Sequence, residues 1–410
     1  MIIPLSRPNL DKKEITSVTK TIYSGWITQG PKVEEFEENF SNYTGSKYAA
    51  AVSSCTTGLH LSLLAVGVQP GDLVITVSHS YIATANAIRH AFGEPVFVDV
   101  NRDNYNMDYE SLKNFIENKC ISRNGNLYFK DYKKLIKDSP TLKYLKNVNG
   151  KIKSIIVPHQ IGIPADVYKI KRLIKNYNIS IIEDAACAIG SKYNFNNQLF
   201  NIGRPIGDLT CFSFHPRKLL TTGDGGMVTS NNKSLINKVK LLRNHGMNKD
   251  SFKRRKTSSY FFDEHIESGF NYRLTDLQAS IGIEQLKKID KMVKERRKIA
   301  NEYIEKLSSI QNVSTFKESK KIIVNWQSFP VNILSKESSK QIVNFLYRNG
   351  IYSKRGVMNS HEEPPYIKQR WTLPNSEHIL EKTFLLPMYS GLKDKEIEYV
   401  YSKVKEFFEK

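Results

Sequence analysis

Short apolar runs alternate with amphipathic segments along the first 230 residues of the chain. Two amphipathic helices are predicted before this alternation begins. The first covers residues 11–23, where Asn9 could act as the cap and Asp11 suits the first turn, and the second begins at Pro31. The apolar face of the second helix holds Val33, Phe36, Phe40 and Tyr43. Each later apolar run is short and bounded by turn residues, as expected for a buried strand.

The alternation predicts a largely parallel sheet with helices on both faces, because strands that are apolar on both sides must be covered on both sides. The predicted strands are residues 49–54, 73–77, 95–100, 154–158, 179–184, 211–214 and 226–230. The helices between them begin at Thr56 and near Tyr81 and cover residues 109–117 and 166–176. Residues 121–152 interrupt the pattern with a polar, lysine-rich segment that we interpret as a surface insertion.

The pattern changes in the last third of the chain. Apolar positions with heptad-like spacing predict one long helix over about 275–307. A strand over 324–333, a helix near 337–348 and a closing amphipathic helix follow. The closing helix would bury Ile397, Val400, Val404 and Phe407. We therefore predict an α/β protein with a large domain over residues 1–285, which includes an N-terminal arm, and a smaller α+β domain over residues 286–410.

Composition narrows the class of protein. The chain has 410 residues and a formal net charge of +20, which is compatible with binding to nucleic acid or to an anionic membrane surface. The lysines are spread over many predicted helices without a nucleic-acid-binding motif, so an attraction for phosphorylated small molecules is the better interpretation. No apolar run is long enough to cross a membrane, and the N-terminus lacks the pattern of a signal peptide, so we expect a cytoplasmic protein.

The cysteine and histidine patterns argue against disulfides and metal sites. The four cysteines show no CxxC spacing, which favours reduced thiols over disulfides or a zinc site. They are Cys55, Cys120, Cys187 and Cys211. His159, His215 and His245 come from separate segments and lack the spacing of metal ligands. We therefore expect no metal.

Candidate chemistry gathers at the ends of predicted strands. Asp184 ends the strand ISIIED, and ligands of an open α/β sheet bind beyond the carboxyl ends of its strands, although such a carboxylate can also cap the next helix. Lys218 follows the strand CFSF and is surrounded in sequence by Phe214, Pro216 and Leu219. An enclosed amine can form an imine with a carbonyl cofactor, and burial should lower its pKa. The ordinary alternative is a lysine that extends to solvent.

Two further stretches suit the same kind of cofactor. In SSCTTGLHLSL, Thr56 and Thr57 open a helix, and the free amides and hydroxyls of a helix N-terminus can bind a phosphate, although a plain N-cap has the same pattern. Tyr81 in SHSYIATANAI follows another strand, where its ring could stack on a flat heteroaromatic ring or pack against the helix. A lysine, an acid, a phosphate site and a stacking surface together match pyridoxal 5'-phosphate (PLP).

At these residues the sequence resembles the PLP-dependent nucleotide-sugar aminotransferases of the DegT/DnrJ/StrS type, whose large PLP-binding domain belongs to the fold-type I aminotransferases. The resemblance rests on IIEDAACAIGS, SFHPRKLLTTGDGGMV, HSYIATANAI, SSCTTGLHLSLLAVGVQPGDLVIT and GFNYRLTDLQASIG. It implies that Lys218 is the Schiff-base lysine and that Asp184 is the partner of the pyridine nitrogen. The other cofactor contacts that it implies are Thr56, Thr57 and Ser213 at the phosphate and Tyr81 and Ala186 on the two ring faces.

The resemblance also implies a homodimer with shared active sites. Asn271 in GFNYR matches an asparagine that reaches the phosphate of the neighbouring subunit's cofactor, and the loop around Trp26 would border the same site. Departures from the family pattern are visible as well. Cys187 stands where many members have histidine or glutamine, Cys55 replaces a small residue, and HQIGIP at residues 159–164 differs from the usual run. These departures weaken any transfer of substrate identity and leave the core chemistry in place.

From this resemblance we expect an aminotransferase that moves an amino group from glutamate or glutamine to the keto group of a nucleotide-linked deoxysugar. Pyridoxamine 5'-phosphate would be the second cofactor form, and the product would serve surface polysaccharide or other glycan biosynthesis. A small phosphorylated ketone is an alternative acceptor, because the basic loop that holds Lys354, Arg355 and His361 could bind either kind of phosphate.

Two other functions remain open at this stage. A PLP-dependent sugar dehydratase resembles the aminotransferases, but those enzymes carry histidine where this chain has Lys218. A PLP-binding regulatory protein without catalytic activity is the second, and the intact pair of Lys218 and Asp184 argues against it.

Overall fold

The computed structural model describes residues 1–136, 138–248 and 264–409. Its largest sheet contains β1 (Tyr48–Val52), β2 (Leu73–Val77), β3 (Glu94–Val98), β4 (Cys120–Arg123), β5 (Asn126–Phe129), β6 (Lys151–Pro158), β7 (Ser180–Asp184), β10 (Leu209–Ser213) and β11 (Gly226–Ser230). The order is β1-β11-β10-β7-β6-β2-β3, and the hairpin β4–β5 joins at β6. The strands β10, β7, β6, β2 and β3 are parallel, whereas β11 runs antiparallel to both of its neighbours.

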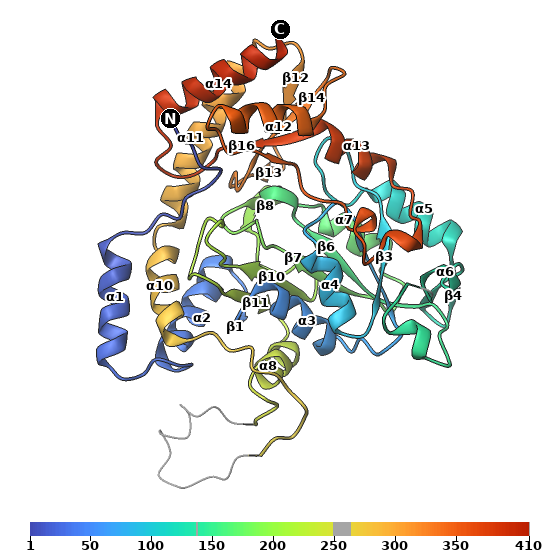
Figure 1. Ribbon diagram of the computed structural model, residues 1–410. Coiled ribbons are helices and arrows are strands. Elements are labelled where there is room, and N and C mark those ends of the chain that lie inside the picture. Colours follow the sequence, from blue (N-terminus) through green and yellow to red (C-terminus); the bar gives the residue numbers. More distant parts are fainter. Residues whose placement is uncertain (137, 249–263, 410) are drawn as a thin grey trace.

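Helices cover both faces of this sheet (Figure 1). In β1, Ala49 and Ala51 join one core while Ala50 and Val52 join the other, because successive side chains of a strand point to opposite faces. One face packs against α3 (Cys55–Ala65), α4 (Ala83–His90) and α8 (Lys233–Leu242). The other packs against α2 (Pro31–Thr44), α5 (Tyr109–Lys119), α7 (Val167–Leu173) and α10 (Asp276–Leu286). The predicted α/β fold with a mostly parallel mixed sheet is confirmed.

A smaller antiparallel sheet follows in the C-terminal part of the chain. Its strands, in spatial order, are β12 (Val313–Thr315), β14 (Phe329–Ile333), β16 (Thr383–Leu386) and β15 (Lys354–Arg355). The helices around it are α11 (Ile289–Leu307), α12 (Ser339–Arg348), α13 (Pro374–Lys382) and α14 (Asp394–Phe408). A three-stranded sheet links the two parts, because β13 (Ile322–Ile323) pairs with β8 (Lys192–Phe195), which pairs with β9 (Gln198–Asn201).

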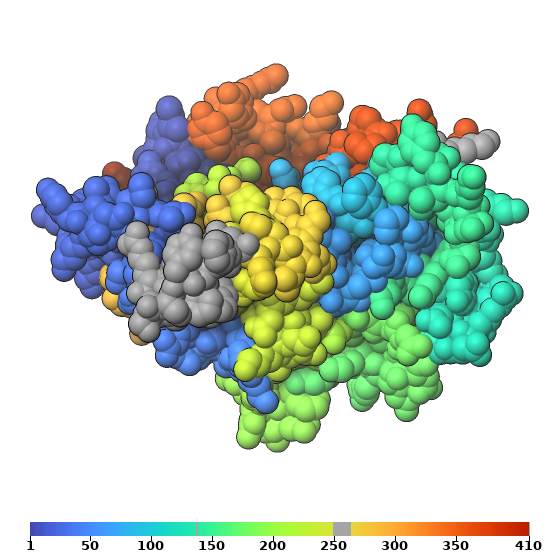
Figure 2. Space-filling view, turned by 90° about the horizontal axis from the view of Figure 1, so that it is seen from below, coloured from blue at the N-terminus to red at the C-terminus, as the bar shows by residue number. Residues whose placement is uncertain are grey.

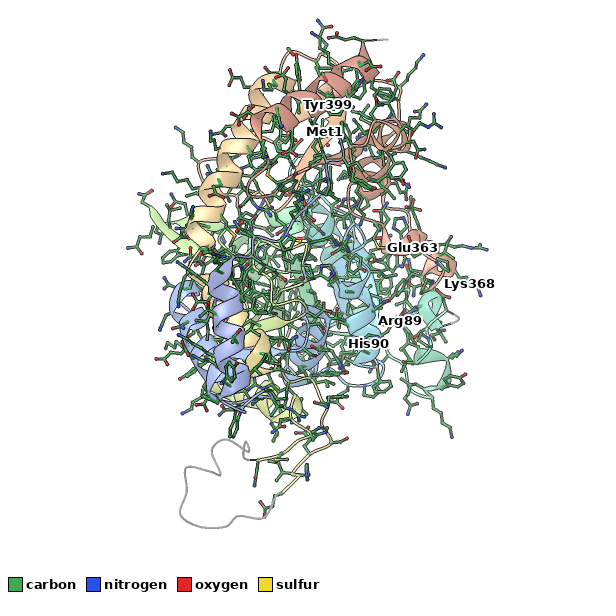
Figure 3. The ribbon with its side chains drawn as sticks, turned by 60° about the vertical axis from the view of Figure 1, so that its left-hand side comes forward. Met1, Arg89, His90, Glu363, Lys368 and Tyr399 are labelled. Carbon is green, nitrogen blue, oxygen red and sulfur yellow. The ribbon has the colours of Figure 1, made fainter. Side chains whose placement is uncertain are left out.

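The N-terminal residues lie on the small sheet rather than on the large one. Ile3 N donates to Gly350 O at 2.9 Å, and Met388 N donates to Leu5 O at 3.0 Å. Figure 3 shows Met1 close to Tyr399 of α14, whose hydroxyl donates to Asn349 O at 3.1 Å. The chain therefore starts at the small sheet and crosses to the large one before α1 (Lys12–Tyr23) begins.

Some helix boundaries differ from the sequence prediction. Asp11, and not Asn9, is the N-cap of α1, and its carboxylate takes part in a capping box. The single helix expected over 275–307 consists of α10 and α11, which are separated by a short break that apolar spacing cannot reveal. The last buried aromatic residue of α14 is Phe408, whereas Phe407 is only partly buried.

Two other segments also differ. The segment 121–152 is more than a surface insertion, because β5 pairs with β6 and Leu127 and Phe129 are buried in the core. The strand expected over 324–333 is regular only in its second half, where β14 lies, and residues 324–328 form an irregular loop. Within the residues that the structure describes, no helix combines the length and apolar character that a membrane span requires.

Candidate active site

The loops that follow four parallel strands surround one cavity of about 250 Å³. Tyr81 comes after β2, Ile161 after β6, Cys187 after β7 and Lys218 after β10, and all four line this cavity. The C-terminal part of the chain closes it with Gln327, Ser328, Lys354, Gly356, Val357, Leu385, Leu386 and Met388. The position beyond the carboxyl ends of the strands is the one expected for the ligand of an open α/β sheet.

Lys218 lies in the loop between β10 and β11, with its amine directed at a sulfur atom. Lys218 Nζ donates a hydrogen bond to Cys187 Sγ over 3.1 Å. Burial lowers the pKa of Lys218, but its interactions with Cys187, Cys55 and Asp184 raise it by more, so the pKa lies above its ordinary value. The expectation of a lowered pKa is therefore not met in the protein alone, because these neighbouring groups outweigh the effect of burial.

Asp184 ends β7 with its carboxylate buried and held from two sides. Thr84 Oγ1 in α4 donates to Asp184 Oδ2 at 2.7 Å, and Ala186 N donates to Asp184 Oδ1 at 3.1 Å. Cys55 Sγ lies 3.8 Å from the same Oδ1 atom. The site therefore holds a carboxylate that two donors fix in place, and this carboxylate is one of the groups that raise the pKa of Lys218.

The N-terminus of α3 lies beside the ends of β10 and β11. Ser54 is the N-cap of α3, and Thr57 closes the capping box with its hydroxyl, whereas the hydroxyl of Thr56 has no hydrogen bond among the described residues. Ser213 pairs with Gly226 across the ladder. A Cβ atom at Gly226 would lie 2.8 Å from Cys55 N, so only glycine lets the strand approach the helix this closely. Thr56, Thr57 and Ser213 thus lie around one helix N-terminus, which suits an anion.

The two predicted ring contacts come from different loops. Tyr81 is 58% exposed and lines the cavity, so its ring is accessible to a ligand bound there. Ala186 is half-buried and follows Asp184 in the loop after β7. These positions place an aromatic face and a small side chain near the carboxylate and the lysine.

Asn271 and Trp26 do not line the cavity of their own chain. Asn271 is exposed and forms an isolated bridge with Asn244, which lies shortly after α8. Figure 2 shows α8 and the segment that follows residue 264 side by side on one face of the molecule. Trp26 Nε1 donates to Gln29 O at 3.1 Å in a loop that Asp276 anchors by accepting from Gly30 N at 2.8 Å. Neither residue therefore contributes to the cavity of Lys218 in its own chain.

Comparison with known proteins identifies the family. The profile of the DegT/DnrJ/EryC1/StrS aminotransferase family matches residues 8–405. The chain belongs to this family. The aminotransferase is 35% identical over 410 residues to the uncharacterized protein MJ1066 of Methanocaldococcus jannaschii, covering 98% of this chain and 97% of that one. It is 31% identical over 412 residues to the spore coat polysaccharide biosynthesis protein SpsC of Bacillus subtilis, covering 98% and 96% of the two chains.

Solved structures agree with this assignment. The pyridoxamine-phosphate form of the putative sugar aminotransferase Spr1654 from Streptococcus pneumoniae has a TM-score of 0.83 at 25% identity and covers 99% of both chains. This protein is accordingly a PLP-dependent aminotransferase of the fold-type I class.

The described residues of this aminotransferase fit PLP. Lys218 offers an amine to a cavity that also exposes the ring of Tyr81. The glycine at position 226 lets the N-terminus of α3 lie next to Ser213, and the Thr56 hydroxyl there has no hydrogen bond among the described residues, which suits a phosphate. Asp184 supplies the carboxylate that a pyridine nitrogen needs as its partner. No group of three or more metal-binding side chains suited to an ion occurs in the described part of the chain.

Sequence analysis missed several residues that position this site. Thr84 lies in the stretch SHSYIATANAI, one helical turn after Tyr81, and its hydroxyl donates to Asp184 Oδ2 at 2.7 Å. Gln327 contacts the backbone on both sides of Lys218, with Oε1 accepting from Leu219 N at 2.9 Å and Nε2 donating to Arg217 O at 2.7 Å. No signal in the sequence points to Gln327, because it lies in the segment that was predicted as a strand.

The predicted basic loop is divided by the structure. Lys354 lines the cavity of Lys218, whereas Arg355 lines a different depression beside Glu377, because neighbouring residues of a strand point to opposite faces. His361 is 5% exposed and cannot hold a phosphate. Its Nδ1 atom lies 2.6 Å from Ser78 Oγ, and its Nε2 atom lies 3.3 Å from Glu377 Oε1, so both ring nitrogens are already bonded.

Proposed function

We propose that this aminotransferase transfers an amino group from glutamate or glutamine to the keto group of a nucleotide-linked deoxysugar, in the biosynthesis of a surface polysaccharide or another glycan. Two of the matched proteins support a sugar substrate. One is named for spore coat polysaccharide biosynthesis, and the other is a putative sugar aminotransferase. The reducing cytoplasm, where nucleotide sugars are used, is part of this proposal and agrees with four free cysteines.

The observation that carries the acceptor proposal is a group of cations beside the reactive lysine. Arg217 and Lys354 line the same cavity as Lys218, and neither forms an ion pair with an acidic residue in the described ranges. Burial lowers the pKa of Lys354, and repulsion by Arg217 and Lys218 lowers it further. Uncompensated positive charge at a partly enclosed cavity favours a ligand with several negative charges, such as a nucleoside diphosphate.

The chain's own residues can be assigned roles from their positions. When bound, PLP supplies an electron sink for the carbon that carries the amino group. Asp184, fixed by Thr84, would keep a proton on the ring nitrogen, since a carboxylate beside it stabilises the positive form. Lys218 Nζ would hold the cofactor and then move a proton at the reacting carbon, and Cys187 would orient that amine. Thr56, Thr57 and Ser213 would hold the phosphate at the start of α3.

A homodimer is also part of the proposal. Asn271 is exposed and does not line the cavity of its own chain, so its side chain is available to a neighbouring subunit. Substitution of Asn271 by Ala should weaken PLP binding in every site of a dimer. Mixing it with Lys218→Ala subunits should restore one working site per mixed dimer, which activity measurements on the mixture would reveal. A monomer by sedimentation, or no recovery on mixing, would contradict a shared site.

The acceptor is tested with the pyridoxamine-phosphate form of the protein. Nucleoside-diphosphate keto-deoxysugars, small keto phosphates and ketones without phosphate are each mixed with it, and loss of the pyridoxamine absorbance is recorded. We expect the nucleotide-linked ketones to react at least about tenfold faster in kcat/KM, which corresponds to about 1.4 kcal/mol. A preference for small keto phosphates would establish the alternative acceptor instead.

Matched variants show whether the cations recognise the acceptor. Lys354→Ala should raise KM for the nucleotide-linked ketone, because Lys354 lines the cavity. Arg355→Ala removes the same charge from the next residue, which faces away from that cavity, and should leave KM within about twofold. Equal effects of the two variants would mean that only the overall charge of the protein matters.

A further inference from the structure

The side chain of Gln327 spans the backbone on both sides of Lys218. Gln327 is 7% exposed, and its amide makes hydrogen bonds with Arg217 O at 2.7 Å and Leu219 N at 2.9 Å. These are the backbone groups immediately before and after Lys218. One amide therefore fixes the peptide units that carry the reactive lysine, from a segment more than a hundred residues later in the chain.

The neighbouring Asn325 fixes the residue that Lys218 contacts. Asn325 Nδ2 donates to Cys187 O at 2.9 Å and to Ile189 O at 2.7 Å. Asn325 Oδ1 accepts from Gln327 N at 2.9 Å, so the two amide side chains belong to one network. The loop Asn325–Gln327 thus holds the backbone of both partners in the contact between Lys218 Nζ and Cys187 Sγ.

The loop itself is held in a conformation that a strand could not adopt. Trp326 has a φ of 51°, in the left-handed region that is unfavourable for a bulky residue. Its ring is buried and stacks on Phe329 with a centroid separation of 5.4 Å. Arg296 from α11 is buried and donates to Trp326 O and Gln327 O, each at 3.1 Å. Such a conformation persists only where the surroundings over-determine it.

We propose that Gln327 is a positioning residue for Lys218: it sets the direction in which the amine enters the cavity. This inference rests on the proposed role of Lys218 as the residue that bonds the cofactor. Reaction of an amine with a carbonyl needs the two atoms close together and aligned, and a misplacement of about 1 Å can slow such a step by about a hundredfold. Loss of both hydrogen bonds of Gln327 frees the backbone on each side of Lys218.

Gln327→Leu removes both hydrogen bonds at nearly constant volume. The matched control is Gln285→Leu in α10. Gln285 is fully buried, and its amide donates to Asn9 O and Glu14 Oε1, both at 2.7 Å, but it does not line the cavity. Both variants should lower the unfolding temperature, because each leaves buried polar groups without partners.

The distinguishing measurement is the reaction of the apo-protein with added PLP. The rate at which the visible band of lysine-bound cofactor appears is recorded, and the bond is then trapped with borohydride and located by mass spectrometry. We expect Gln327→Leu to slow the band by about ten- to a hundredfold and to reduce trapping at Lys218, while Gln285→Leu reacts within about twofold of the wild type. Equal rates for the two variants would overturn the positioning role.

A second variant keeps the inference testable if Gln327→Leu does not fold. Gln327→Glu keeps the acceptor for Leu219 N and replaces the donor to Arg217 O by a second oxygen, which cannot bond that carbonyl, so it should also slow the reaction. A wild-type rate in Gln327→Glu would overturn the inference as well. If the wild-type protein gives neither a band nor trapping at Lys218, then the proposed role of Lys218 fails, and this outcome is distinct from a failure of Gln327.

Discussion

The surroundings of Asp184 and of Lys218 are built in different ways. Asp184 takes its hydrogen bonds from Thr84 and Ala186, which belong to the strand and helix units of the large sheet. Lys218 contacts Cys187 through its amine, and its backbone is held by Gln327 from an irregular loop of the C-terminal part. The carboxylate is thus positioned by elements of the large sheet that carries it, whereas the lysine also depends on a loop of the C-terminal part of the chain.

The two arrangements suit the different chemical tasks proposed for Asp184 and Lys218. A group that must keep both its charge and its position benefits from contacts within one rigid sheet. A group that must bond a cofactor and later move a proton sits at the junction of two parts of the chain. Substitutions around Asp184 and around Lys218 should therefore change different steps of the reaction.

The largest effect is expected for Lys218→Ala. Removal of the amine abolishes the covalent bond to PLP and the proton transfer, so turnover should fall by about 10²–10⁴-fold or more. The visible absorbance band and borohydride trapping should both disappear. Lys354→Ala, which removes the other lysine of the cavity, should keep the band and the trapping. Trapping that persists in Lys218→Ala would mean that another lysine bonds the cofactor.

Asp184→Asn should have the next largest effect. The amide keeps the shape of the side chain and loses the negative charge, so turnover should fall by about 10²–10³-fold, the size found when one preorganised electrostatic partner is removed. The band should still form, because Lys218 is untouched. Asp224→Asn, at an exposed position of the loop that carries Lys218, is the matched control. Turnover near the wild-type value in Asp184→Asn would refute the role given to this carboxylate.

Sequence analysis predicted the Asp184 side better than the Lys218 side. The strands β2 and β11 have the predicted boundaries, and Asp184, Tyr81 and Lys218 follow strands as expected. Short apolar runs in a parallel sheet encode such positions directly. The loop Asn325–Gln327 could not be predicted, because the left-handed Trp326 interrupts an apolar run that is typical of a strand.

The basic loop gives a second example. Lys354, Arg355 and His361 are close in sequence and were interpreted as one phosphate site. In the structure, Lys354 and Arg355 point to opposite faces of their strand. His361 is buried, and both of its ring nitrogens are bonded, to Ser78 and Glu377. A sequence shows how many cationic residues a loop contains, but the strand pairing in the folded protein determines which of them face the same cavity.

Acid should lower the stability of the protein through His79, which lies between β2 and Tyr81. Burial lowers the pKa of His79 to about 4, and the ring stays neutral while its Nδ1 atom donates to Asn359 Oδ1 at 2.9 Å. Because the unfolded chain binds this proton near pH 6.5 and the folded protein does not, the free energy of unfolding should fall as the pH drops from about 6.5 to about 4. The loss should reach about 2–3 kcal/mol.

His79→Asn removes the titration and keeps a donor for Asn359. Urea unfolding of the wild type and of this variant at pH 7 and pH 5 should therefore diverge, with the smaller pH dependence in the variant. His60, whose pKa burial also lowers to about 4, contributes equally to both proteins and cancels in the comparison. Parallel pH profiles would show that His79 is protonated in the folded protein.

The smallest effect is expected for Thr84→Val, which separates the positioning of Asp184 from that of Lys218. The valine keeps the volume and removes the hydroxyl that donates to Asp184 Oδ2, which should cost about 1.5 kcal/mol, or about tenfold in kcat. Thr84→Ser should restore most of the rate. Thr76→Val in β2 is the control, since the buried hydroxyl of Thr76 has no hydrogen bond among the described residues. If Thr84→Val slows turnover without slowing PLP attachment, while Gln327→Leu slows attachment, then the two sides of the site are positioned independently; equal changes in both measurements would show that one network holds them.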